Sequence, residues 1–231
     1  MMIKNCKDYL YLIWKSPMTR RQYIVGQLTK NRQYEFQYVQ EVDKAIEEGF
    51  TPLMAFPNLD EVYYSDHLFL SFSCRLPDEK RKDIDRILKK YGLYEYDAYE
   101  LLKASGARLP IDNMHLIDPI FDTDVVFERK FSMAGVRHYL GCSGNNCEKS
   151  VSVALDEEVF LQKEPENEFD SKAIRIVNRD GLMLGYVPRY YCDAFNRIMN
   201  EGKSISCHVF FVNKADNCSD CILLNAKIDK G

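Results

Sequence analysis

The chain has 231 residues, of which 46% are hydrophobic and 29% are charged, and its formal net charge at pH 7 is −4. This length suits one large domain or two small ones, and the composition is that of an ordinary globular protein. The acidic balance argues against nonspecific coating of duplex DNA, which depends on a broad excess of Lys and Arg. It leaves room for a small site that takes one strand end with a few charges and aromatic rings.

No apolar run in the sequence approaches the ~20 residues that a membrane-spanning helix needs. Residues 1–5 lead into a strand-like segment without the apolar core of a signal peptide. We therefore expect a cytoplasmic protein with no membrane partner. In that compartment its eight cysteines are expected to be thiols or metal ligands rather than disulfides.

The first half of the chain mixes strand and helix patterns. Runs of β-branched and aromatic residues predict three strands, at 9–14, 22–28 and 33–38. Apolar residues at helical spacing predict three helices, at 39–48, 78–91 and 96–104. Gly49 and Gly92 follow two of these helices and fit the position where a helix stops.

The second half is mostly strand-like. Eight candidate strands lie at 125–131, 136–142, 151–155, 159–162, 173–177, 182–187, 205–212 and 222–228. One helix is predicted among them, at 189–199. The segment 178–181, Asn-Arg-Asp-Gly, is typical of a hairpin turn, because Asp-Gly supplies the positive φ that such turns need. Short strands at this spacing favour a barrel or a sandwich.

A turn-rich stretch at residues 118–124 separates the two patterns. We therefore predict an α+β protein with two domains. The first is a mixed α/β module over residues 1–122. The second, over residues 123–231, is a small β-barrel with one helix.

Three blocks of the second half carry a family resemblance. They are Gly135-Val136-Arg137-His138-Tyr139-Leu140-Gly141, the stretch 163–174 (Lys-Glu-Pro-Glu-Asn-Glu-Phe-Asp-Ser-Lys-Ala-Ile), and Leu184-Gly185-Tyr186-Val187-Pro188-Arg189. In order and spacing these blocks resemble the HIRAN family, a small OB/SH3-like barrel module that binds nucleic-acid ends. The resemblance therefore implies that residues 123–231 bind DNA.

The HIRAN site accepts the 3′ end of single-stranded DNA, and the resemblance implies roles for residues of the middle block. Asn167 matches the amide of the turn. Phe169 matches an aromatic residue that packs against the terminal base. Asp170 matches the carboxylate that accepts a hydrogen bond from a free 3′-hydroxyl and repels a phosphate placed there. From the residues alone, Phe169 could instead belong to the core, and Asp170 could simply cap the following turn.

The outer blocks supply the remaining predicted contacts. Arg137 matches a basic residue that grips a phosphate, and His138 stands where the family usually has an aromatic. Tyr139 is expected to point into the core, opposite His138, by strand alternation. The rest of the predicted nucleic-acid-binding set comprises Lys172, Tyr186 and Arg189. No aromatic lies between Val212 and Cys221, where the best-known form has a second stacking residue.

The first half resembles another family through four short stretches, Val25-Gly26-Gln27-Leu28, Tyr34-Glu35-Phe36-Gln37-Tyr38, Leu68-Phe69-Leu70 and Leu76-Pro77. They are similar to the small N-terminal subdomain of HipA-type toxin kinases, over about residues 9–110. The sequence has none of the Gly-rich loop, His-Arg-Asp or Asp-Phe-Gly motifs of a kinase core. The resemblance therefore implies a domain for a protein partner, or a helper domain, without kinase activity.

Four cysteines offer a possible zinc site. Cys218 and Cys221 form a Cys-x-x-Cys pair, and Cys142 and Cys147 form a looser pair. Four thiolates suffice for tetrahedral zinc if the two loops meet. The alternative is four reduced thiols.

The leading prediction is a non-enzymatic adaptor that binds single-stranded DNA, at 3′ ends, in a DNA-repair or defence setting. One alternative is a protein-interaction module of toxin–antitoxin type that acts through residues 1–122 without nucleic acid. Another is a metal-dependent nuclease that uses Asp170 and Lys172, with Asp156 as second carboxylate. Such nucleases need two acids to hold magnesium and a lysine near the attacked phosphate.

Overall fold

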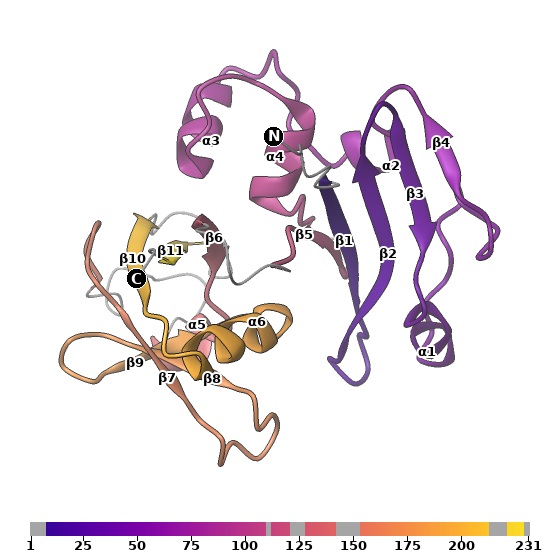
Figure 1. The fold of residues 1–231 in the computed structure, drawn as a ribbon. Helices are drawn as coiled ribbons and strands as arrows, with labels where there is room; N and C mark the ends of the chain where they lie inside the picture. Colours follow the sequence, from indigo (N-terminus) through magenta and orange to yellow (C-terminus); the bar gives the residue numbers. More distant parts are fainter. Residues whose placement is uncertain (1–7, 110–111, 121–127, 142–152, 213–220, 229–231) are drawn as a thin grey trace, which may run out of the picture. The chain divides into compact units, whose positions relative to one another are not determined.

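The computed structural model describes residues 8–109, 112–120, 128–141, 153–212 and 221–228 (Figure 1). Their contacts divide the chain into two compact units, Met1–Pro119 and Ile120–Gly231. The domain boundary expected after residue 122 lies outside the described residues and stays a prediction. Within the described part of the chain, no helix is long and apolar enough to cross a membrane.

The first unit is built on an antiparallel sheet of five strands in the order β4-β3-β2-β1-β5. The strands are β1 (Asp8–Lys15), β2 (Gln22–Lys30), β3 (Tyr34–Tyr38), β4 (Tyr63–Ser65) and β5 (Met114–Ile117). The helices are α1 (Val42–Glu47), α2 (Leu70–Ser73), α3 (Ile84–Tyr91) and α4 (Ala98–Ser105). The three predicted strands and three predicted helices are confirmed, whereas β4, β5 and α2 had not been predicted.

Local chemistry explains two features of the first unit. Gly26 lies so close to β3 that an added Cβ would stand 2.7 Å from the Phe36 ring, which accounts for the glycine in the Val-Gly pair. The predicted helix at 78–91 begins only at Ile84. Asp78 accepts a hydrogen bond from the Lys80 backbone N–H at 2.7 Å, and this local turn competes with the helical pattern.

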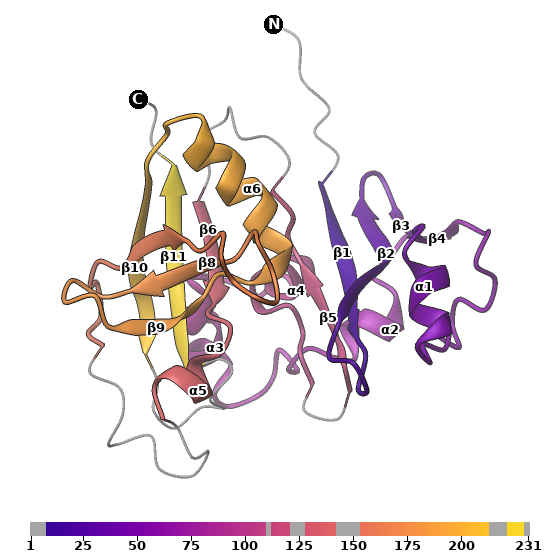
Figure 2. The same cartoon turned by 90° about the horizontal axis from the view of Figure 1, so that it is seen from below.

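The second unit contains two antiparallel sheets of three strands each, in the orders β10-β11-β6 and β7-β8-β9. The strands are β6 (Glu128–Ser132), β7 (Phe160–Lys163), β8 (Ile174–Val177), β9 (Met183–Tyr186), β10 (Ile205–Val212) and β11 (Ile222–Ile228). The helices are α5 (Val136–Tyr139) and α6 (Arg189–Asn200). Helix α6, seen along its length in Figure 2, contributes Phe195 and Ile198 to the buried core.

The α+β class is confirmed, but the described strands of the second unit do not close into a regular barrel. Single bridges, Ala134–Tyr186 and Glu158–His208, join the two sheets at two corners. Strand pairing does not continue beyond the Ala134–Tyr186 bridge, because both chain segments turn away soon after it. Gly135 has a φ of +78° and leads into α5, and Pro188 leads into α6.

Two predicted strands of the second unit are wrong in their described parts. Residues 136–139 form α5, because Gly135 starts a helical turn in which the Leu140 N–H donates to the carbonyl of Val136 at 2.9 Å. Residues 153–155 lie in a turn rather than a strand, and the Ala154 N–H donates to the Glu157 carboxylate at 2.8 Å. The other described strands and the hairpin turn at Gly181 (φ +79°) are confirmed.

Candidate nucleic-acid interface

The turn between β7 and β8 is organised by the side chain of Asn167. Its Oδ1 accepts hydrogen bonds from the backbone N–H groups of Phe169, at 3.0 Å, and Asp170, at 3.1 Å. An Asn side chain that bonds its own following backbone fixes a tight turn. The turn presents Phe169 to solvent with 91% of its surface exposed. The alternative in which Phe169 belongs to the core is therefore wrong.

The Asn167 amide is itself held in orientation by two residues. Its Nδ2 donates to Glu164 Oε2 at 2.7 Å and lies 3.2 Å from the Tyr186 hydroxyl oxygen. The Tyr186 hydroxyl in turn donates to the same Glu164 oxygen at 2.7 Å. Because Nδ2 faces these acceptors, Oδ1 must face the turn. Glu164 and Tyr186 thus set the geometry in which Phe169 is displayed.

The hydrogen bonds of this network shift the pKa values of both partners. The hydrogen bond to Glu164, and then burial, raise the pKa of Tyr186, while hydrogen bonds from Tyr186 and Asn167 lower the pKa of Glu164. The stabilisation from Glu164 is present above its unfolded pKa and is lost as pH falls through the lower folded value. The stabilisation from Tyr186 is present below the unfolded pKa of Tyr186 and is lost as pH rises through its higher folded pKa. The network is therefore intact at neutral pH.

Glu164 offers a test of this support that needs no ligand. In Glu164→Gln one oxygen can still accept from both Tyr186 and Asn167, whereas Glu164→Ala leaves both donors without their acceptor. A lost hydrogen bond of ~1 kcal/mol corresponds to about fivefold faster amide exchange. We expect that acceleration at the Phe169 and Asp170 amides in Glu164→Ala and little change in Glu164→Gln. Equal exchange in both variants would contradict the supporting role of Glu164.

Asp170 and Lys172 fasten the same turn to α6. Asp170 Oδ1 accepts from the Lys172 N–H at 3.0 Å, which is the capping contact that the alternative interpretation expected. Asp170 Oδ2 lies 3.4 Å from Arg189 Nε. Lys172 Nζ lies 2.7 Å from a carboxylate oxygen of Asp193, on α6. The Asn196 amide donates to the Lys172 carbonyl at 2.8 Å. The turn is thereby held at both its tip and its base.

Helix α5 approaches this site through a row of aromatic rings. The ring centroids of Tyr139 and Tyr186 lie 5.5 Å apart, and those of His138 and Tyr139 lie 4.8 Å apart, both edge to face. Tyr139 is partly exposed, so the prediction that it points into the core is wrong. Arg137 lies exposed on the same helix. The structure thus links His138 to Tyr186 and, through Glu164, to the turn.

Sequence reasoning missed four residues of this arrangement. Asp193 and Asn196 lie on α6, outside the motif blocks that carried the family resemblance, whereas Glu164 and Tyr139 lie inside them. The role of Glu164 depends on a partner 22 residues away, Tyr186, which no local pattern reveals. The role of Tyr139 was obscured because its segment was predicted to be a strand.

Most of the predicted zinc ligands lie outside the described residues. So does the segment in which the best-known family member has a second stacking residue. Cys142, Cys147 and Cys218 lie outside the described residues, as does the segment 213–220, while Cys221 is buried beside the start of β11. Among the residues described, no group of three or more His, Cys, Asp or Glu side chains is placed to hold a metal ion. The zinc site stays a prediction.

The residues of the alternative nuclease have other partners in the structure. Asp170 and Lys172 are engaged with Arg189 and Asp193, as described above. Asp156 lies beside β10, where its N–H donates to the Val209 carbonyl at 2.8 Å. The nuclease stays an untested alternative with no geometric support among these three residues.

The fold and the site together define a two-unit α+β chain whose second unit displays an aromatic ring on a braced turn. Residues 126–226 match the family model of the HIRAN domain, and residues 18–110 match that of the HipA N-terminal domain. Both resemblances drawn from the sequence are confirmed. A search of curated proteins found no match.

Three solved structures are similar to part of the chain. The crystal structure of the HIRAN domain of human HLTF is 22% identical, with 44% of this chain and 74% of that chain covered, at a TM-score of 0.34. The NMR structure of the HLTF HIRAN domain in its DNA-bound conformation is 24% identical, with 45% and 75% covered, at 0.31. A crystal structure of a protein from Lactobacillus plantarum is 17% identical, with 46% and 100% covered, at 0.32.

Proposed function

We propose that the second unit binds single-stranded DNA at its 3′ end and that the chain acts as a non-enzymatic adaptor. The observation that carries this proposal is the Phe169 ring, 91% exposed on a turn that Asn167 fixes from within. An exposed aromatic ring held in one place is a platform on which any base can stack. The match of residues 126–226 to the HIRAN family supports the same function.

Selectivity for a 3′-hydroxyl follows from the carboxylate next to this ring. Asp170 is only partly exposed, and its Oδ2 faces the Arg189 guanidinium at 3.4 Å. A carboxylate accepts a hydrogen bond from a hydroxyl but repels a terminal phosphate. Arg189 and Lys172, which pair with Asp170 and Asp193, are the basic residues beside this carboxylate. Arg137 and His138 extend the site along α5.

The test compares short labelled single strands that end in a 3′-hydroxyl or a 3′-phosphate, by fluorescence anisotropy on the full chain. The wild type is expected to bind the hydroxyl end about tenfold more tightly, given like-charge repulsion of ~1–2 kcal/mol. Asp170→Asn keeps an acceptor oxygen and removes the charge, so it should abolish that preference. Asp180→Asn, at the opposite end of the same sheet, is the matched control. An unchanged preference in Asp170→Asn would contradict the assignment.

We further propose that the first unit contacts a protein partner, which the match of residues 18–110 to the HipA N-terminal domain supports. A toxin–antitoxin module of this kind would function without nucleic acid, and it remains the second candidate function. DNA repair, defence and a cytoplasmic location stay predictions.

A further inference from the structure

The outer face of the β7-β8-β9 sheet begins directly at the turn that carries Phe169. In the register of the sheet, Gln162 stands opposite Arg175, and Arg175 stands opposite Tyr186. Residues directly opposite in an antiparallel pair project to the same face. The neighbours of Arg175 on β8, Ile174 and Ile176, are fully buried on the other face. Arg175 therefore lies beside Tyr186 on the surface that adjoins the proposed DNA-end site.

The Arg175 guanidinium is held at one edge only. Its Nε donates to Gln162 Oε1 at 2.9 Å, and the side chain is exposed. In the described part of the chain, its two terminal nitrogens have no ion-pair or hydrogen-bond partner. The charge of Arg175 also helps to lower the pKa of Glu164, after the hydrogen bonds from Tyr186 and Asn167. A guanidinium that is oriented yet open along its outer edge suits bidentate binding of a phosphate.

The same face offers a second aromatic ring. Phe160 and Gln162 alternate with Leu161 on β7 and so share the outer face, and Phe160 is 39% exposed. Glu164 follows Phe160 by four positions, which in extended chain is a length of about 13 Å. This distance leaves room for more than the terminal nucleotide.

We propose that Arg175 binds an internal phosphate of the strand whose 3′ end lies at Phe169. The strand then runs from the turn across the outer face of β7-β8-β9, toward Phe160. The inference rests on the proposed function and deepens it, because it assigns the path of the DNA strand. It also assigns a phosphate contact to Arg175, which lies outside the three motif blocks that predicted the site.

The slope of affinity against salt tests this contact directly. Each phosphate contact to a single strand contributes about 0.7 to the slope of log K against log salt concentration. Arg175→Gln is expected to flatten the slope by about that amount and to weaken binding about fivefold. Arg175→Lys keeps the positive charge, so its salt slope should equal that of the wild type. Its affinity should be only partly restored, because Lys cannot bind a phosphate with two parallel N–H groups as the guanidinium does.

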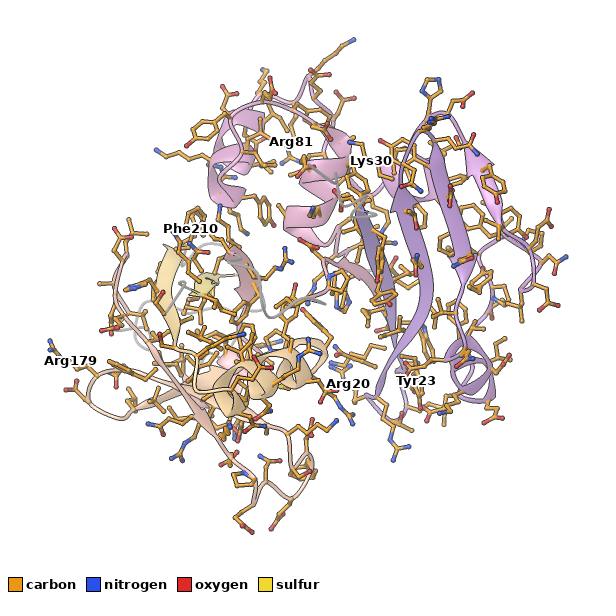
Figure 3. All side chains as sticks on the ribbon, in the orientation of Figure 1. Arg20, Tyr23, Lys30, Arg81, Arg179 and Phe210 are labelled. Atoms are coloured by element: carbon orange, nitrogen blue, oxygen red, sulfur yellow. The ribbon has the colours of Figure 1, made fainter. Side chains whose placement is uncertain are left out.

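Arg179→Gln is the matched control, since it removes the same charge from the same unit. Arg179 lies in the β8–β9 hairpin turn, at the end of the sheet opposite the Phe169 turn (Figure 3). It should leave slope and affinity unchanged. For a mononucleoside with a free 3′-hydroxyl, which has no internal phosphate, Arg175→Gln should also have no effect.

The outcomes separate this inference from the function on which it rests. A wild-type chain that binds no single strand would overturn both. Binding that is weakened by Phe169→Ala, with equal salt slopes for Arg175→Gln and Arg179→Gln, would overturn the path across the sheet and leave the end site standing.

Discussion

Replacing Phe169 by Ala is expected to weaken binding of a short single strand about 5- to 100-fold. Stacking of a base on an aromatic side chain contributes ~1–3 kcal/mol, and this ring has no other evident role. With 91% of its surface exposed, it buries almost nothing in the core. The midpoint of urea unfolding should therefore stay where it is.

Leu182→Ala is the matched control for the Phe169 experiment. Leu182 is also a large exposed hydrophobic residue of the second unit, with 55% of its surface exposed, but it lies at the hairpin end of the sheet, away from the Asn167 turn. Both variants are compared with the wild type by anisotropy at one salt concentration. Equal affinities for the two variants would contradict a stacking role for Phe169.

Gly185→Ala is expected to lower the free energy of unfolding of the second unit by ~3–5 kcal/mol. A Cβ at this position would stand 2.7 Å from the Ala134 carbonyl oxygen and 3.3 Å from Met133 Cβ. β9 and the segment at Met133 and Ala134 must separate to admit it. That separation would break the bridge in which Ala134 and Tyr186 exchange two backbone hydrogen bonds of 2.8 Å. Overpacking costs ~1–3 kcal/mol and each lost hydrogen bond ~1 kcal/mol.

Gly181→Ala gives the comparison for Gly185. Gly181 has a φ of +79° and nothing within 4 Å of an added Cβ, so only the backbone cost of about 1–2 kcal/mol applies. Urea unfolding followed by circular dichroism measures both variants. Trp14, the one tryptophan of the chain, lies in the first unit, so its fluorescence reports that unit separately. A Gly185 variant no less stable than the Gly181 variant would contradict the close approach.

The strands that were predicted well are those whose pattern is local and long. Residues 205–212 and 222–228 coincide with β10 and β11, because eight or seven residues of β-branched and apolar character leave few alternatives. β5 has only four residues, and its main support is pairing with β1, where Ile117 stands opposite Tyr11. A contact across about a hundred residues leaves no trace in a local pattern.

The prediction of a strand at 136–142 failed for a different reason. Its residues have strand propensity, but the positive φ of Gly135 turns the backbone into α5. The consequence reaches the site, since α5 turns Tyr139 toward Tyr186 instead of the core.

The candidate site itself was largely accessible from sequence, because its residues cluster in short motif blocks. Asn167, Phe169 and Asp170 could be named from the resemblance of one short block. The support beneath them could not, since Glu164 acts through Tyr186 on another strand. Likewise, the position of Arg175 beside Tyr186 follows only from the register of β8 and β9.

The most direct test of the account is a titration of the full ¹⁵N-labelled chain with a short single strand that ends in a 3′-hydroxyl, followed by amide chemical shifts. The account predicts changes concentrated at residues 164–172, at Tyr186 and at the start of α6. The same changes should be weaker with a 3′-phosphate. Shifts confined to residues 8–119, or no shifts at low salt, would contradict the claim that the second unit binds nucleic acid through the Phe169 turn.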